Sequence, residues 1–145
     1  MTVQIFDQNR PVCVHVQSLE SRYHVFDCLA AQPLLNPQMR EGVLKWICSV
    51  NRQFRFHLET LCLTVALLDR FLFAQAIDPA VLQLAAATAF FVAAKVEEED
   101  PPTTSELMSL CDHAYDRAKF KHMEFIMLDQ VVQQSLPHPD TVQTV

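Results

Sequence analysis

Residues 78–102, which read DPAVLQLAAATAFFVAAKVEEEDPP, decide the class of fold. Asp78 followed by Pro79 is a typical helix start, because the Asp side chain caps the backbone and Pro fits the first helical position. The segment then stays apolar nearly all round, with many alanines, until an acidic run and a proline pair end it. Such a helix is typically buried. We therefore expect a central helix that runs to about Glu98 in an all-α domain.

Two further helices are expected on its N-terminal side. Asn36 and Pro37 repeat the pattern of a cap and a proline, and a broad apolar face follows them. Its members are Met39, Val43, Leu44, Trp46, Ile47 and Val50. Gly42 lies inside this helix, where it costs about 1 kcal/mol relative to alanine. The segment from about Leu58 to Phe73 is apolar nearly all round and predicts a second buried helix.

Two helices are expected on the C-terminal side. The residues from Thr103 to Glu106 have the pattern of a capping box, which predicts a short helix. Its inward residues are expected to be Leu107, Leu110 and Cys111. The last helix is expected from about Asp116 to Gln133. Its inner face is expected to comprise Phe120, Met123, Met127 and either Leu128 or Val131.

The chain is expected to form one domain. A leading helix is predicted from Ser18 and should stop before Pro33, since a residue that precedes proline avoids the α region. We expect an N-terminal arm over residues 1–17, the domain over 18–137 with a five-helix bundle from about residue 36, and a tail over 138–145.

The composition excludes several classes of protein. Half of the 145 residues are apolar, which suffices for a buried core, but only one residue is glycine. The many tight turns of a β-sandwich need residues that tolerate positive φ, and glycine-rich phosphate loops need several glycines. The net charge of −6 argues against binding to nucleic acid, which favours a basic surface.

Cysteine usage and the termini indicate where the protein resides. The five cysteines are odd in number and widely spaced, so we expect them to be reduced. They are Cys13, Cys28, Cys48, Cys62 and Cys111. The apolar run from Leu82 to Val96 is interrupted by polar residues, and no signal segment is evident at the N-terminus. We expect a soluble protein of the nucleus, the cytoplasm or both that binds no membrane.

The sequence shows no pattern that is typical of catalysis or of a metal site. Cys111, Asp112, His113 and His122 are potential ligands, but their spacing matches no common zinc motif. No serine or cysteine lies in an elbow-like turn beside a base. We therefore expect no cofactor, no metal and no enzymatic activity. The acidic run 97–100 opposes the macrodipole of the central helix, which hints at a partner or a nearby basic group.

Several charged residues lie on helices that are expected to be buried, namely Arg40, Asp69, Arg70, Lys95 and Glu124. A buried charge without a partner costs several kcal/mol, so each of them should have one. Arg40 with Asp69 would join two helices inside the domain, and Lys95 with Glu124 would meet at the ends of two helices. Both pairs could serve only to hold two helices of the domain together, or the second pair could hydrogen-bond another protein.

The order of these residues resembles the cyclin box. The matching segments are Met39-Arg40 … Trp46, Glu59-Thr60-Leu61, Leu67–Leu72, Leu82-Gln83-Leu84, Ala94–Glu98 … Pro101-Pro102 and Met123-Glu124. They cover about residues 36–137 and include the positions Arg40, Asp69, Leu84, Lys95 and Glu124 in order. The run of acidic residues after Lys95 is similar to that of atypical cyclins of the G, I and O kinds.

The resemblance implies a five-helix cyclin-box bundle that binds a cyclin-dependent kinase and biases it to its active conformation, in cell-cycle or related control. It assigns Arg40 and Asp69 to a structural salt bridge. It assigns Lys95 and Glu124 to kinase binding near the movable αC helix of the kinase. Val96, Glu97 and Leu128 would belong to the same kinase-binding face, and Gln133 departs from an apolar residue common there.

The resemblance also implies a docking groove for substrates and inhibitors. Its residues here are Met39, Val43, Trp46 and Gln83. Gly42 and Ser49 depart from the usual branched apolar residue and the usual glutamate, so we expect weak recruitment of docking motifs.

Three matters stay open at the level of sequence. Many cyclins carry a second repeat, so this chain is a single-box member, a truncated isoform or a fragment. A cyclin-like scaffold that binds another protein without activating a kinase is the main alternative. A transcription factor of the IIB type shares the fold, but the chain lacks clusters of Lys and Arg.

Overall fold

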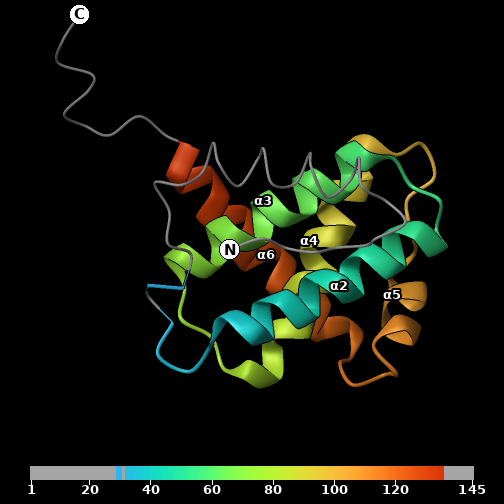
Figure 1. Cartoon of the computed structure of the whole chain (residues 1–145). Coiled ribbons are helices and arrows are strands. Elements are labelled where there is room, and N and C mark those ends of the chain that lie inside the picture. Colours follow the sequence, from blue (N-terminus) through green and yellow to red (C-terminus); the bar gives the residue numbers. More distant parts are fainter. Residues whose placement is uncertain (1–28, 31, 136–145) are drawn as a thin grey trace, which may run out of the picture.

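All regular secondary structure in the described part of the chain is helical. The computed structural model describes residues 29, 30 and 32–135, so the expected arm, nearly all of the leading helix and the tail lie outside this part (Figure 1). Its five α-helices are α2 (Pro37–Gln53), α3 (Leu58–Ala74), α4 (Leu82–Glu97), α5 (Thr104–Leu110) and α6 (Arg117–Ser135). No strand occurs among these residues, which confirms the all-α class.

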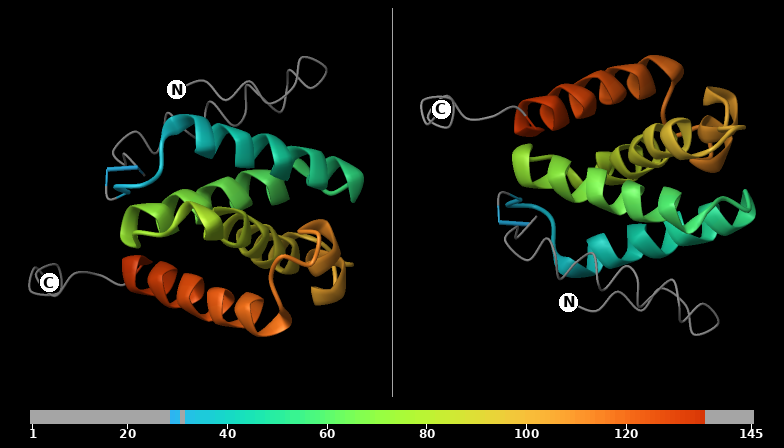
Figure 2. Two further views of the ribbon diagram at one scale, coloured as in Figure 1. Left: turned by 90° about the horizontal axis from the view of Figure 1, so that it is seen from below. Right: turned by 90° about the horizontal axis from the view of Figure 1, so that it is seen from above.

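The central position of α4 is the main feature of the bundle. Helix α4 contacts α2, α3 and α6, and α3 lies between α2 and α6 in both views of Figure 2. Eleven residues of α4 are buried, among them Ala85, Ala86, Ala89 and Ala93, which are fully inaccessible. Small side chains let the neighbouring helices approach closely, as the sequence predicts.

The segment Pro79–Glu97 is long and apolar enough, by length and composition, to cross a membrane. In this fold its apolar side chains pack against the other helices instead, with Phe90 almost fully buried. The expectation that no apolar segment reaches the length of a membrane span is therefore wrong for this segment. The polar residues that interrupt this segment do not lower its mean hydropathy below that of a membrane span.

The helix starts follow the local signals, with one difference. The Oδ1 atom of Asn36 accepts a hydrogen bond from the backbone N–H of Met39 at 2.9 Å, and Thr103 and Glu106 form the expected capping box. Asp78 caps a 3₁₀ turn (Pro79–Val81) and not the α-helix itself, which begins at Leu82. The proline therefore starts the 3₁₀ turn that leads into α4.

Positive φ angles occur at residues that are not glycine. Arg55 follows the end of α2 with φ 58°, and Asp112 and His113 lie between α5 and α6 with φ 51° and 56°. The N–H of Ala114 bonds to the carbonyl of Cys111 at 3.0 Å and closes a tight turn around the latter pair. Left-handed backbone is costly for residues that carry a Cβ atom.

Replacing Gly42 with alanine is expected to raise the free energy of unfolding by about 1 kcal/mol, because glycine is a poor helix former. Gly42 lies on the exposed side of α2, and an added Cβ atom would meet no atom within 4 Å. Urea denaturation of the wild type and of Gly42→Ala measures the difference. A lower midpoint in the variant would contradict the expected gain.

Candidate functional site

The strongest candidate site is an ion pair between two helices at the surface of the bundle. Lys95, in the last turn of α4, donates a hydrogen bond from Nζ to Oε1 of Glu124 on α6. The Lys95 side chain is 42% exposed and that of Glu124 is 23% exposed. Nζ also lies 4.0 Å from the centroid of the Phe91 ring, a cation–π contact that helps to fix the ammonium. The pair is thus ordered and remains accessible to a partner.

Exposed apolar side chains are found on the two helices that carry this pair. Val96 is 67% exposed and Leu128 is 41% exposed, and both are residues that the resemblance assigns to kinase binding. Glu97 is exposed as well. Phe125 follows Glu124 and is 71% exposed, although no pattern in the sequence singles it out. Side chains of this kind are typical of protein interfaces.

The expected inner face of α6 is correct at three positions. Phe120, Met123 and Met127 are buried in the core. Of the two alternatives for the fourth position, Leu128 is exposed, and the side chain of Val131 lies outside the described part of the structure, as does that of Gln133. Leu128 is therefore available to a partner and does not fill the core.

The second charged pair lies inside the domain. Arg40 on α2 donates two hydrogen bonds to Asp69 on α3, from Nε at 2.9 Å and from Nη2 at 2.7 Å. The Arg40 side chain is 6% exposed and that of Asp69 is 21% exposed. The two parallel hydrogen bonds hold α2 against α3 in one relative position. The structure thus brings together both pairs that the sequence suggested.

The residues assigned to a docking groove lie on α2 and at the start of α4. Met39 is exposed, and Val43 and Trp46 are half-buried one and two helical turns further along. Gln83 is half-buried on α4, which contacts α2. Leu44, Ile47 and Val50 form the buried side of α2, so the expected broad face divides into a core side and a partly accessible side.

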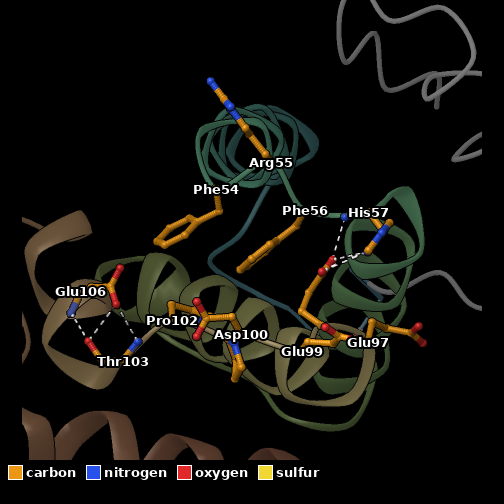
Figure 3. A pocket seen from close by; sticks show the side chains of 12 residues that line it. Phe54, Arg55, Phe56, His57, Glu97, Glu99, Asp100, Pro102, Thr103 and Glu106 are labelled. Atoms are coloured by element: carbon orange, nitrogen blue, oxygen red, sulfur yellow. Dashed lines mark hydrogen bonds and ion pairs between the residues drawn. The ribbon is translucent and has the colours of Figure 1, made fainter.

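One member of the acidic run at the end of α4, Glu98, is bound by residues at the start of α3. Oε1 of Glu98 accepts hydrogen bonds from the backbone N–H of His57 at 2.7 Å and from the Thr60 hydroxyl at 2.6 Å, and the imidazole Nδ1 of His57 lies 3.0 Å away. His57 caps α3, so the carboxylate binds the N-terminus of that helix (Figure 3). This long-range contact was not apparent from the sequence.

The environment of Glu98 favours its ionised form. Burial raises the pKa of the carboxyl, but the hydrogen bonds from Thr60 and His57 outweigh it and hold the pKa below its ordinary value. Glu98 therefore stabilises the fold at neutral pH, and this contribution is lost as the pH falls through the lowered pKa.

Replacing Glu98 with glutamine is expected to lower the free energy of unfolding at pH 7 by about 2 kcal/mol, because the hydrogen bonds lose their charged acceptor. The difference between the two proteins should shrink as the pH falls below the ordinary pKa of a glutamate carboxyl, about 4.3, and through the lowered pKa of Glu98. Urea denaturation between pH 3 and pH 7 measures it, with the exposed Glu99→Gln as a control. A difference that is constant over this range would contradict the assigned role.

The cysteines of the described part of the chain lie in the core. Cys48, Cys62 and Cys111 are buried, and burial raises the pKa of Cys62 and of Cys111 to about 11. Cys13 and Cys28 lie outside the described residues. No group of three or more His, Cys, Asp or Glu side chains that could hold a metal ion occurs within residues 29, 30 and 32–135.

Comparison with known proteins identifies the family. The family described as "Cyclin, N-terminal domain" matches residues 12–132 of this chain. Human "Cyclin-O" is 37% identical over 112 residues, which are 77% of this chain and 32% of that protein. "Cyclin-B1-1" of Arabidopsis thaliana is 34% identical over 128 residues, which are 88% of this chain and 29% of that protein. The chain therefore belongs to the cyclin family and contains a cyclin box.

A solved structure is similar in fold. A viral cyclin from herpesvirus saimiri superimposes with a TM-score of 0.66 at 20% sequence identity and covers 81% of this chain and 53% of that chain. This likeness confirms the cyclin-box fold. The chain spans about a third of the length of the curated relatives named above.

Proposed function

We propose that this chain is a regulatory subunit that binds a cyclin-dependent protein kinase through the face around Lys95 and Glu124. The observation that carries the proposal is the ordered ion pair, which is accessible on helices that also expose Val96 and Leu128. Both charges keep hydrogen-bonding capacity beyond their mutual bond, so they could bind backbone groups of a partner. Membership of the cyclin family supports a regulatory role.

Kinase activation would follow from a shift in conformational population. A kinase is active when its αC helix is turned inward and the Lys–Glu ion pair of the kinase is formed. A subunit that binds this conformation more tightly than the inactive one increases its population by the ratio of the two affinities. Lys95 and Glu124 would supply part of that difference if they hydrogen-bond the kinase only in the active conformation.

Lys95→Ala and Glu124→Ala are each expected to weaken kinase binding about 30-fold, because each removes a charged group that becomes desolvated in the complex. A panel of purified cyclin-dependent kinases, assayed by pull-down and then by titration of kinase activity, measures the effect. The matched control is Glu41→Ala, which breaks the exposed ion pair with Lys45 at 3.5 Å on α2.

The results separate the assigned face from the assigned partner. Binding that survives both Lys95→Ala and Glu124→Ala would place the kinase on another face. Binding without any rise in kinase activity would leave a non-activating scaffold. Failure of the wild type to retain any kinase would overturn the proposal as a whole.

A further inference from the structure

A cleft of about 540 Å³ lies between the turn that joins α2 to α3 and the loop that joins α4 to α5 (Figure 3). The side chains of Phe54 and Phe56 extend from the turn toward the loop, and their rings stack with centroids 5.1 Å apart. Both rings also pack near Phe90 in the core, yet both remain partly exposed in the cleft. A concave site of this size with an aromatic wall is typical of a binding site.

The opposite wall of the cleft is acidic. Five acidic residues line it: Glu97, Glu98, Glu99, Asp100 and Glu106. Glu98 binds the start of α3, and Glu106 accepts hydrogen bonds from Thr103. The carboxylates of Glu97, Glu99 and Asp100 make neither a hydrogen bond nor an ion pair with any residue that the structure describes.

The basic residues at the cleft do not neutralise this wall. Arg55 is among the residues that line the cleft, but its side chain extends away from the carboxylates in Figure 3. His57 is engaged with Glu98. The cleft therefore combines partly exposed aromatic rings with an excess of negative charge, and both features favour a cationic group.

We propose that this cleft binds an arginine-containing segment of a partner protein. A guanidinium group is planar and weakly hydrated, so it can stack on the ring of Phe54 or Phe56 while its N–H groups bind the carboxylates of Glu99 or Asp100. A lysine ammonium would gain the charge interaction but less of the stacking. The inference rests on the shape and charge of the cleft, which shares Glu97 with the face that we propose for kinase binding.

The test measures fluorescence anisotropy of three labelled peptides with this protein. One peptide alternates Arg with Ser and Gly, and the other two carry Lys or Glu in place of Arg. We expect saturable binding of the arginine peptide below about 100 µM, weaker binding of the lysine peptide and none of the glutamate peptide. Failure of the wild type to bind the arginine peptide would overturn the proposal.

Two variants locate the binding site. The double variant Glu99→Gln/Asp100→Asn should weaken arginine-peptide binding about tenfold, whereas Glu41→Gln/Asp112→Asn removes the same charge elsewhere and should change it less than twofold. Phe54→Leu should weaken it about threefold and reduce the preference for Arg over Lys. Equal losses in both double variants would show binding to net charge alone and would overturn the assignment. Glu99 and Asp100 are exposed, so their substitution should leave the fold intact. The comparison of the two double variants therefore remains decisive even if Phe54→Leu unfolds.

Discussion

Replacing Asp69 with alanine is expected to lower the free energy of unfolding by about 3–4 kcal/mol, because Arg40 would stay buried without its carboxylate. Arg40 donates two hydrogen bonds to Asp69, and these join α2 to α3 in the middle of the bundle. Part of the Asp69 carboxylate is accessible, so water can compensate for some of the loss, which places the expected value at the lower end for a buried pair. Chemical denaturation of the purified domain measures the change.

Two controls separate the charge pair from the general effect of substitution. Glu41→Ala breaks the exposed pair with Lys45 on the same helix and should change the free energy of unfolding by less than about 0.5 kcal/mol. Arg40→Met/Asp69→Leu replaces both partners by apolar side chains and should recover most of the stability. If Asp69→Ala and Glu41→Ala lowered the free energy of unfolding equally little, the internal pair would contribute no more to stability than a surface pair.

Replacing Gln32 with alanine is expected to lower the free energy of unfolding by about 3 kcal/mol, because three hydrogen bonds to backbone groups are lost together. Gln32 is buried and donates from Nε2 to the carbonyls of Leu72 at 2.7 Å and Gln75 at 2.5 Å, and its Oε1 accepts from the N–H of Ile77 at 3.0 Å. The last carbonyls of a helix lack partners within the helix, and this side chain supplies partners at the end of α3.

A volume-matched variant separates hydrogen bonding from packing. Gln32→Met keeps most of the side-chain volume but satisfies none of the three backbone groups, so it should be nearly as destabilised as Gln32→Ala. Gln53→Ala, at an exposed position at the end of α2, should be nearly neutral. Full stability of Gln32→Met in urea denaturation would show that the side chain acts by filling space.

Local signals in the sequence predict the elements well. Asn36 with Pro37, and Thr103 with Glu106, act within one helical turn, so their caps are evident without knowledge of the fold. The two charged pairs could also be predicted, because charged residues on helices that are expected to be buried require partners, and few were available. The roles of these residues toward a kinase stay predictions.

Contacts between distant parts of the chain could not be predicted in this way. Glu98 binds the start of α3 across 41 residues, and Gln32 binds the end of α3 across 40 and 43 residues. Both are single polar side chains that bond to backbone, so no spacing or periodicity marks them. The exposure of Phe125 could not be predicted for a different reason. Helix α6 carries apolar residues on several of its sides, and only the packing of the bundle selects the side that faces the core.

The position of the single glycine leaves room to increase the stability of the protein. The single glycine occupies a helix, where any other common residue except proline would serve better, while His113 holds a backbone conformation that glycine adopts freely. Exchanging the two residue types, with glycine at position 113 and histidine at position 42, would suit the backbone conformation at both positions. Both positions are far from Lys95 in the sequence. A chain improved in this way would tolerate the disruptive substitutions that an interface map requires, and its losses of affinity could then be measured without losses of folded protein.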